Sequence, residues 1–217
     1  MDLESARIYN TQISNINSFN TPEEIINTDY PSMEEVVNQD NGGGGLATFI
    51  HHSIEAVLVS EGNEEAEFIT VEANLGGMQV RLINAYGKQE KENVEKREKF
   101  FQKLDEEIVA AKLQNKGIIM ELDANSKLGP DFIKNDKHEM SENGKLLLRL
   151  VQRNDLIVIN SLDICEGLIT RERITDKVNE QSTIDFIIVC RKMLPFVTRM
   201  IIDEARAHVL TKYAKEN

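Results

Sequence analysis

The chain has 217 residues, enough for one domain with a sizeable core and too few for two full domains of ordinary size. Hydrophobic residues make up 41% of it, which excludes a wholly disordered protein. The net charge of −12 excludes strong non-specific binding to nucleic acid. An acidic enzyme can still act on phosphodiesters when its carboxylates hold divalent cations.

The two cysteines, Cys165 and Cys190, lie far apart and have no metal-ligand spacing. Two cysteines in a chain of this length do not form a disulfide framework, so a reducing, intracellular compartment is expected. No run reaches the roughly 20 apolar residues of a membrane span. The first ten residues also lack the basic region and apolar run of a signal peptide.

Residues 1–41 differ in composition from the rest, being rich in Asn, Ser, Thr, Asp and Glu. The segments starting at Thr21 and Ser32 resemble capping boxes, which predict short helical turns. We expect residues 1–41 to form a poorly ordered segment and residues 42–217 to form the domain. Residues 42–45 are four glycines, and they predict a flexible turn because no Gly-Lys-Ser/Thr follows them.

Four runs with the composition of β-strands follow, at residues 46–50, 55–59, 68–75 and 78–86. The last two are separated by Gly76-Gly77, a two-residue loop that indicates a hairpin. Together these runs predict antiparallel sheet.

The rest of the chain alternates helices and strands. Apolar residues at helical spacing predict a helix over residues 91–114, with Gly117 just beyond it. A short apolar strand that runs into polar residues follows over 117–125, and a second helix is expected after Ser141. Strands are predicted over 155–160, 182–190 and 196–202, whereas residues 161–181 are polar and irregular. Hairpins mixed with helical crossovers predict an α/β (α+β) layered sandwich.

Candidate chemistry lies where apolar strands meet polar residues. Tyr86 ends one predicted strand, and Asp123 and Asn125 end another. Side chains two residues apart on a strand share a face, so Asp123 and Asn125 together could hold a metal ion, a water or a phosphoryl oxygen. The alternative for this pair is a strand-end turn, in which Asp and Asn are common for backbone reasons.

Asp185 stands inside the strand pattern Ser-Thr-Ile-Asp-Phe-Ile-Ile-Val, with bulky apolar residues on both sides. A charge embedded in a strand is costly unless it is paired or functional. A buried structural partner is the competing explanation for Asp185. For Tyr86 the alternative is half-buried packing with its hydroxyl at the rim.

Taken together, these segments resemble the endonuclease/exonuclease/phosphatase superfamily, and within it the retrotransposon-encoded endonucleases. The matching segments are, in the family's order and spacing, GGGGLATFIHHSI, GGMQVRLINAYG, IIMELDANSKLG, ENGKLLLRLVQRNDLIVINS and STIDFIIV, within about residues 42–203. No single motif is specific, but the ordered set is. The resemblance implies a sandwich of this type, incomplete at both ends.

The resemblance also implies a function, which is phosphodiester hydrolysis with a divalent metal, usually Mg²⁺. Asp123 matches the residue that activates the attacking water, and Asn125 matches one that supports the transition state. Tyr86 matches a phosphate-contacting tyrosine, and Asp185 an aspartate that orients a catalytic histidine. DNA is the implied partner, with possible fusion to a reverse transcriptase in the full-length element.

The chain also departs from the family pattern. Residues 1–41 contain no matching copy of the family's front Asn and metal-binding Glu, and Glu34 and Glu35 fall in a helical pattern. The terminal Ser-Asp-His is absent, and His208 follows Ala207 where an aspartate belongs, so His208 is interpreted as an ordinary residue. No metal ligand is therefore assigned.

These departures predict weak or no activity for this chain. The alternatives are a non-catalytic remnant with at most a binding role, or a phosphatase or lipid phosphodiesterase of the same superfamily.

Overall fold

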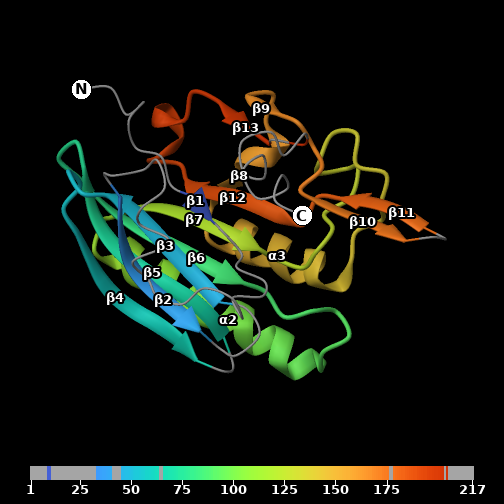
Figure 1. Cartoon of the computed structure of the whole chain (residues 1–217), viewed down its shortest axis with the longest axis horizontal. Helices are drawn as coiled ribbons and strands as arrows, with labels where there is room; N and C mark the ends of the chain where they lie inside the picture. The colour runs from blue at the N-terminus through green and yellow to red at the C-terminus, as the bar shows by residue number, and fades with distance from the viewer. Residues whose placement is uncertain are drawn as a thin grey trace, which may run out of the picture.

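A computed structural model of the chain describes residues 9–10, 33–40, 45–63, 66–175, 178–202 and 204. Its largest feature is a mixed six-stranded sheet (Figure 1). The strands, in spatial order, are β4 (Ala56–Asn63), β5 (Ala66–Leu75), β6 (Met78–Tyr86), β7 (Gly117–Asp123), β12 (Asp185–Cys190) and β8 (Leu156–Val158). Strands β6 and β7 are parallel, and every other neighbouring pair is antiparallel. The predicted hairpin is confirmed, because Gly76 and Gly77 both have positive φ angles, of 61° and 88°.

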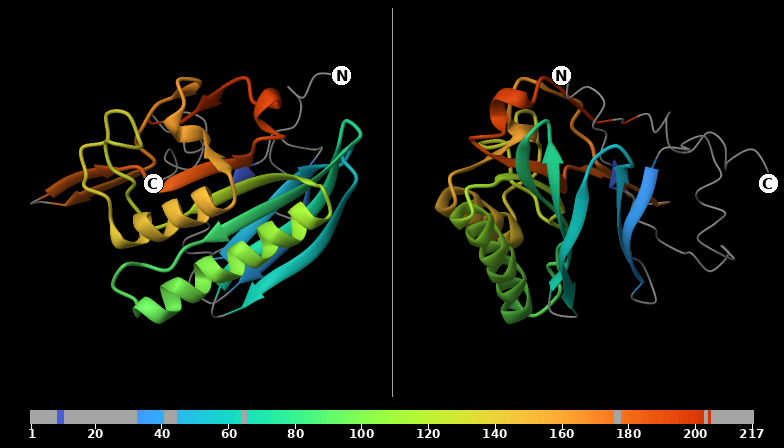
Figure 2. Two further views of the ribbon diagram at one scale, coloured as in Figure 1. Left: turned by 180° about the vertical axis from the view of Figure 1, so that it is seen from behind. Right: turned by 90° about the vertical axis from the view of Figure 1, so that its left-hand side faces the viewer.

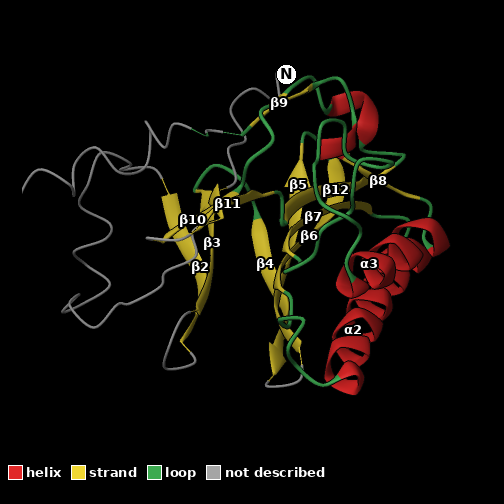
Figure 3. Ribbon diagram, turned by 90° about the vertical axis from the view of Figure 1, so that its right-hand side faces the viewer, coloured by secondary structure: helices red, strands yellow, loops and turns green. Residues whose placement is uncertain are grey.

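A smaller sheet packs against one face of the large one. It has the order β1 (Tyr9–Asn10), β3 (Gly45–His51) and β2 (Met33–Asp40), and β3 contacts β5 and β6 (Figure 3). Alternate residues Leu46, Thr48 and Ile50 of β3 are buried, as expected for a strand with one covered face.

Two predictions for this region were wrong. Residues 33–40 form a strand in place of a helical turn, because pairing with β3 overrides the local capping pattern. The strand at residues 45–51 belongs to the second sheet and does not pair with β4. The helical turn predicted after Thr21 lies outside the described residues.

Two helices cover the other face of the large sheet (Figure 2). Helix α2 (Val94–Leu113) begins at Asn93, whose side chain accepts a hydrogen bond from the backbone N–H of Glu95. Helix α3 (Glu142–Arg153) begins at the predicted Ser141 cap, whose Oγ accepts from the N–H of Gly144. The inner faces of both helices join the sheet residues in one core, although Val94 at the start of α2 is exposed.

The segment predicted to be irregular, residues 161–181, contains structure of its own. Strands β10 (Arg171–Thr175) and β11 (Val178–Ser182) form an antiparallel hairpin, which projects from the body of the molecule (Figure 1). The short strand β9 (Cys165–Glu166) pairs in parallel with β13 (Met200–Ile201), which is all that forms of the strand predicted over 196–202. Single-turn 3₁₀ helices, η2 (Ile159–Ser161) and η3 (Leu194–Phe196), complete this region.

The layers are therefore sheet, sheet and helices, which confirms the predicted α/β layered sandwich (Figure 3). Within the described part of the chain, no helix has the length and apolar character needed to cross a membrane.

Candidate active site

Three of the predicted site residues stand side by side across the large sheet. Tyr86 is the last residue of β6 and is in register with Asp123, the last residue of β7. Asp123 is in turn in register with Asp185, the first residue of β12. Because β12 runs antiparallel to β7, its beginning lies at the edge where β6 and β7 end. Cross-strand partners place their side chains on the same face, so the three side chains share one rim of the sandwich. We call these three residues the rim row.

Asn125 reaches the same rim by a different route from the one predicted. The strand ends at Asp123, and Asn125 has a left-handed backbone with φ of 44°, which asparagine tolerates better than most residues. Its N–H donates to Asp123 Oδ1 at 2.9 Å, and its side-chain Nδ2 donates to the carbonyl of Gly87 at 2.8 Å. The turn proposed as an alternative is thus present, and the period-two argument does not apply to Asn125.

The carboxyl of Asp185 has an unusual environment. Burial raises its pKa to about 7, and the neighbouring charge of Asp123 adds to that rise. The Thr170 hydroxyl and the Arg171 guanidinium act in the opposite direction. A carboxyl whose proton is lost near neutral pH, beside a second carboxyl, is typical of a functional edge.

Backbone hydrogen bonds hold the start of β12 in place. The hydroxyl of Thr170 accepts from the backbone N–H of Ile184 at 2.9 Å and of Asp185 at 3.1 Å. On the other side, Asn160 donates to the carbonyl of Asp185 at 3.1 Å and accepts from the N–H of Ile187 at 3.0 Å. Sequence reasoning missed both residues, because their roles depend on contacts with the backbone of a strand that lies far away in the sequence.

The loops that follow β6 and β7 are tied together. The N–H of Gly87 donates to the carbonyl of Asp123 at 2.6 Å, and a Cβ at this glycine would lie only 2.8 Å from the carbonyl oxygen of Ala124. Asn143, fully buried in the first turn of α3, donates to the carbonyls of Lys88 at 2.7 Å and Asn125 at 3.1 Å. Its own side-chain oxygen accepts from Arg97 at 3.1 Å. Asn143 therefore fixes the spacing of both loops.

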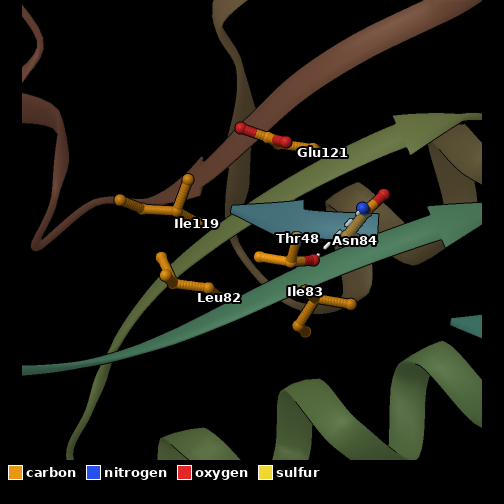
Figure 4. A pocket seen from close by; sticks show the side chains of 6 residues that line it. All are labelled: Thr48, Leu82, Ile83, Asn84, Ile119 and Glu121. Atoms are coloured by element: carbon orange, nitrogen blue, oxygen red, sulfur yellow. Dashed lines mark hydrogen bonds between the residues drawn. The ribbon is translucent and has the colours of Figure 1, made fainter. Parts of the chain in front are cut away.

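Deeper between the two sheets lies a second buried carboxyl, Glu121, two residues before Asp123 on the same strand face. Figure 4 shows Asn84 turned toward Thr48 of β3, with an Asn84 Nδ2 to Thr48 Oγ1 distance of 3.3 Å. The Glu121 carboxyl points toward Ile119, away from the end of β7 where Asp123 lies (Figure 4). Burial raises the pKa of Glu121 to about 7, and it has no hydrogen-bond partner among the described residues.

The donors for a metal ion form an incomplete set. Among the described residues, no group of three or more His, Cys, Asp and Glu side chains is placed to hold a metal ion. The rim row offers two carboxylates, and Mg²⁺ commonly takes one or two of these together with waters and substrate phosphate. The part of the chain that the structure describes thus fits Mg²⁺ only as a two-carboxylate site completed by other ligands.

A histidine beside Asp185 is also not found in the described part of the chain. His51 stacks on His52 in the turn after β3, and His138 bonds to Asp136 at 2.9 Å. None of the three is hydrogen-bonded to Asp185. His208 lies outside the described residues.

Several solved structures have an arrangement of strands and helices similar to that of this chain. The endonuclease domain of TRAS1, a telomere-specific non-LTR retrotransposon, superposes with a TM-score of 0.53 at 16% identity, covering 75% of this chain and 68% of that one. TDP2 from D. rerio, complexed with a single-strand DNA product, gives 0.54 at 11% identity, covering 85% and 72%. An endonuclease/exonuclease/phosphatase family protein from Bacteroides thetaiotaomicron gives 0.53 at 13% identity, covering 85% and 69%.

The chain therefore has the endonuclease/exonuclease/phosphatase fold, as its motifs predicted. No protein-family model and no curated protein sequence matches it. At these identities the likeness establishes the architecture alone, because proteins that share a fold can differ in function.

Proposed function

We propose that this chain hydrolyses phosphodiester bonds of DNA with the help of Mg²⁺, using the rim row and Asn125. The observation that carries the proposal is the register of Tyr86, Asp123 and Asp185 across three neighbouring strands. Residues far apart in sequence, each matching a family motif, meet at one edge of the sandwich. The likeness to a retrotransposon endonuclease supports DNA as substrate and a place in a mobile element, where the domain would be joined to a reverse transcriptase.

Each residue has a role that its position allows. Asp123 accepts the proton of the attacking water or aligns that water. Tyr86, at the end of β6, donates a hydrogen bond from its phenol to a phosphate oxygen, and Asn125 stabilises the negative charge that develops on the phosphate. Asp185 holds and orients a partner group at the rim, an imidazole in the family pattern. Asp123 and Asp185 would hold the Mg²⁺ ion, which when bound polarises the phosphate and stabilises the leaving oxygen.

A second candidate is a non-catalytic domain that only binds its partner. It is favoured by the incomplete donor set, because the described residues provide two carboxylates and no histidine at the rim. Loss of one electrostatic stabiliser typically costs on the order of 10²–10³ in rate, so a site lacking two would retain little activity.

A plasmid-nicking assay with Mg²⁺ separates the two candidates. We expect weak nicking by the unmodified chain and a loss on the order of 10²-fold or more in Asp123→Ala. Glu98→Ala, an exposed substitution on α2, is the matched control. Nicking that is absent, or equal in the Asp123 variant, would refute the hydrolytic proposal and leave the binding domain. Release of inorganic phosphate from monoesters, without strand cleavage, would identify a phosphatase.

A further inference from the structure

A pocket of about 320 Å³ opens beside the rim row, and the proposed hydrolysis does not use it. Its walls are the loop after β6, the loop after β7, the N-cap of α3 and the β10–β11 hairpin. The pocket is also lined by Asn125, which directly follows Ala124, and by Ile184, which directly precedes Asp185. The pocket therefore lies next to the loop that carries Asn125 and to the start of β12, where Asp185 lies.

Both signs of charge line the pocket, but the carboxylates are already engaged. Glu180 forms an ion pair with Lys127 at 2.8 Å, and Glu90 accepts from the N–H of Asn143 at 3.2 Å. The first contact joins the hairpin to the loop after β7. The second joins the loop after β6 to α3. The Glu180–Lys127 pair is neutral, whereas Glu90 keeps its negative charge, so the two remaining cations give the lining a net charge of +1.

Arg171 and Lys91 are those cations. Both are exposed and line the pocket, Arg171 from the hairpin and Lys91 from the loop after β6. Neither side chain makes an ion pair or hydrogen bond with a described residue, although the charge of Arg171 helps to lower the pKa of Glu180. Arg171 directly follows Thr170, whose hydroxyl accepts a hydrogen bond from the N–H of Asp185. The backbone of Arg171 is therefore held close to the rim row. The charge of Arg171 acts to lower the pKa of Asp185, as expected for a cation near that carboxyl.

We propose that this pocket is an anion subsite in which Arg171, assisted by Lys91, binds the phosphate next to the one that is hydrolysed. A planar guanidinium can hold two phosphate oxygens at once, which suits this task better than an ammonium group. A substrate that fills both places carries consecutive phosphates. The subsite thus assigns the substrate class as a nucleic-acid strand, in preference to an isolated phosphomonoester. This inference rests on the proposed function.

The test measures binding without catalysis. A fluorescein-labelled single-stranded oligonucleotide is titrated with the protein in EDTA at several salt concentrations, and anisotropy is recorded. We expect Arg171→Gln to weaken binding by about 5- to 10-fold at low salt and to reduce the salt slope by about 1. Arg171→Lys should retain part of the affinity, because the charge remains and the two-oxygen contact does not.

The matched control is Arg191→Gln, which makes the same change in net charge at the far end of β12. Arg191 is an exposed arginine paired with Asp155 at 2.8 Å, away from the pocket. The affinity of Arg191→Gln for the oligonucleotide, and the salt slope of that binding, should equal those of the unmodified chain. Thermal unfolding of each variant checks that folding is intact, and a variant with lowered stability is replaced by Arg171→Lys in the comparison.

Several results would overturn the subsite. These are undetectable oligonucleotide binding by the unmodified chain, equal losses in Arg171→Gln and Arg191→Gln, or displacement of the oligonucleotide by inorganic phosphate at equal total phosphate. The subsite and the proposed hydrolysis can fail separately. Binding that depends on Arg171 without plasmid nicking would refute hydrolysis alone, and nicking with binding indifferent to Arg171 would refute the subsite alone.

Discussion

The Asp185 carboxyl carries the clearest pH signal at the rim. Burial and the charge of Asp123 raise its pKa to about 7, so its ionised fraction increases as pH rises from 6 to 8. If hydrolysis requires the carboxylate, kcat/KM at sub-saturating Mg²⁺, where the rim row is largely metal-free, should increase about 10-fold over this range. In Asp185→Asn the residual activity should be low and flat with pH. Parallel pH profiles for the two proteins would show that this group is not the one that titrates.

Glu121 makes a separate prediction about stability. Its pKa lies at about 7 when folded and near 4.5 when unfolded, so the folded state binds the proton more tightly. The unfolding free energy is therefore highest below the unfolded pKa and decreases as pH rises to about 7. Glu121→Gln removes this loss, and we expect it to be more stable than the unmodified chain at pH 8 by up to about 3 kcal/mol.

Urea unfolding at pH 4.5 and pH 8 measures this difference. Glu98→Gln, an exposed glutamate on α2, is the control and should change stability little at either pH. A Glu121→Gln protein that is less stable at pH 8 would mean that the carboxylate has an ionic partner, and the burial argument for Glu121 would then be wrong.

The first turn of helix α3 contacts the loops that carry the candidate site. The side chain of Asn143 makes three hydrogen bonds, to the loops after β6 and β7 and to Arg97. Removing a buried side chain of this kind leaves polar groups unsatisfied, so Asn143→Ala should lower stability by about 2–3 kcal/mol. Because Asn125 is among its partners, oligonucleotide cleavage by the folded protein should also decrease.

The same helix offers a matched control at its other end. Asn154, its C-cap, is also buried and donates to Asp105 at 2.6 Å, far from the rim row. Asn154→Ala should lose comparable stability without a specific loss of cleavage. If both variants lose cleavage in proportion to stability, Asn143 has no positioning role beyond folding.

Much of the large sheet could be predicted from the sequence, because its strands carry strong local signals. The glycine pair at residues 76–77 predicted the β5–β6 hairpin, and the helical period predicted α2 to within a few residues. The strand at residues 33–40 could not be predicted, since its pairing with β3 is a tertiary effect that opposes its capping pattern. The β10–β11 hairpin was missed because its residues are mostly polar and charged on both faces.

At the site, the motifs identified candidate side chains, and strand pairing across the sheet brings three of them to one edge. Tyr86, Asp123 and Asp185 come from three elements, and their alignment depends on strand order and register. The supporting groups Thr170, Arg171 and Asn143 carry no local signature, because their roles arise from contacts across the molecule.

The net charge of the whole molecule influences how strongly it attracts or repels a substrate. A net charge of −12 opposes DNA at long range, so contact depends on local cations such as Arg171. The proposed function and the anion subsite both require that the three side chains of the rim row lie together at one edge of the sheet in solution.

A carboxyl-carbon NMR titration of the unmodified chain and of Asp123→Asn tests that assembly most directly. If Asp123 and Asp185 face each other across β7 and β12, removing the charge of Asp123 must lower the pKa of Asp185 from about 7. An Asp185 pKa that is the same in both proteins would place the two carboxyls apart, and the hydrolytic edge would not exist.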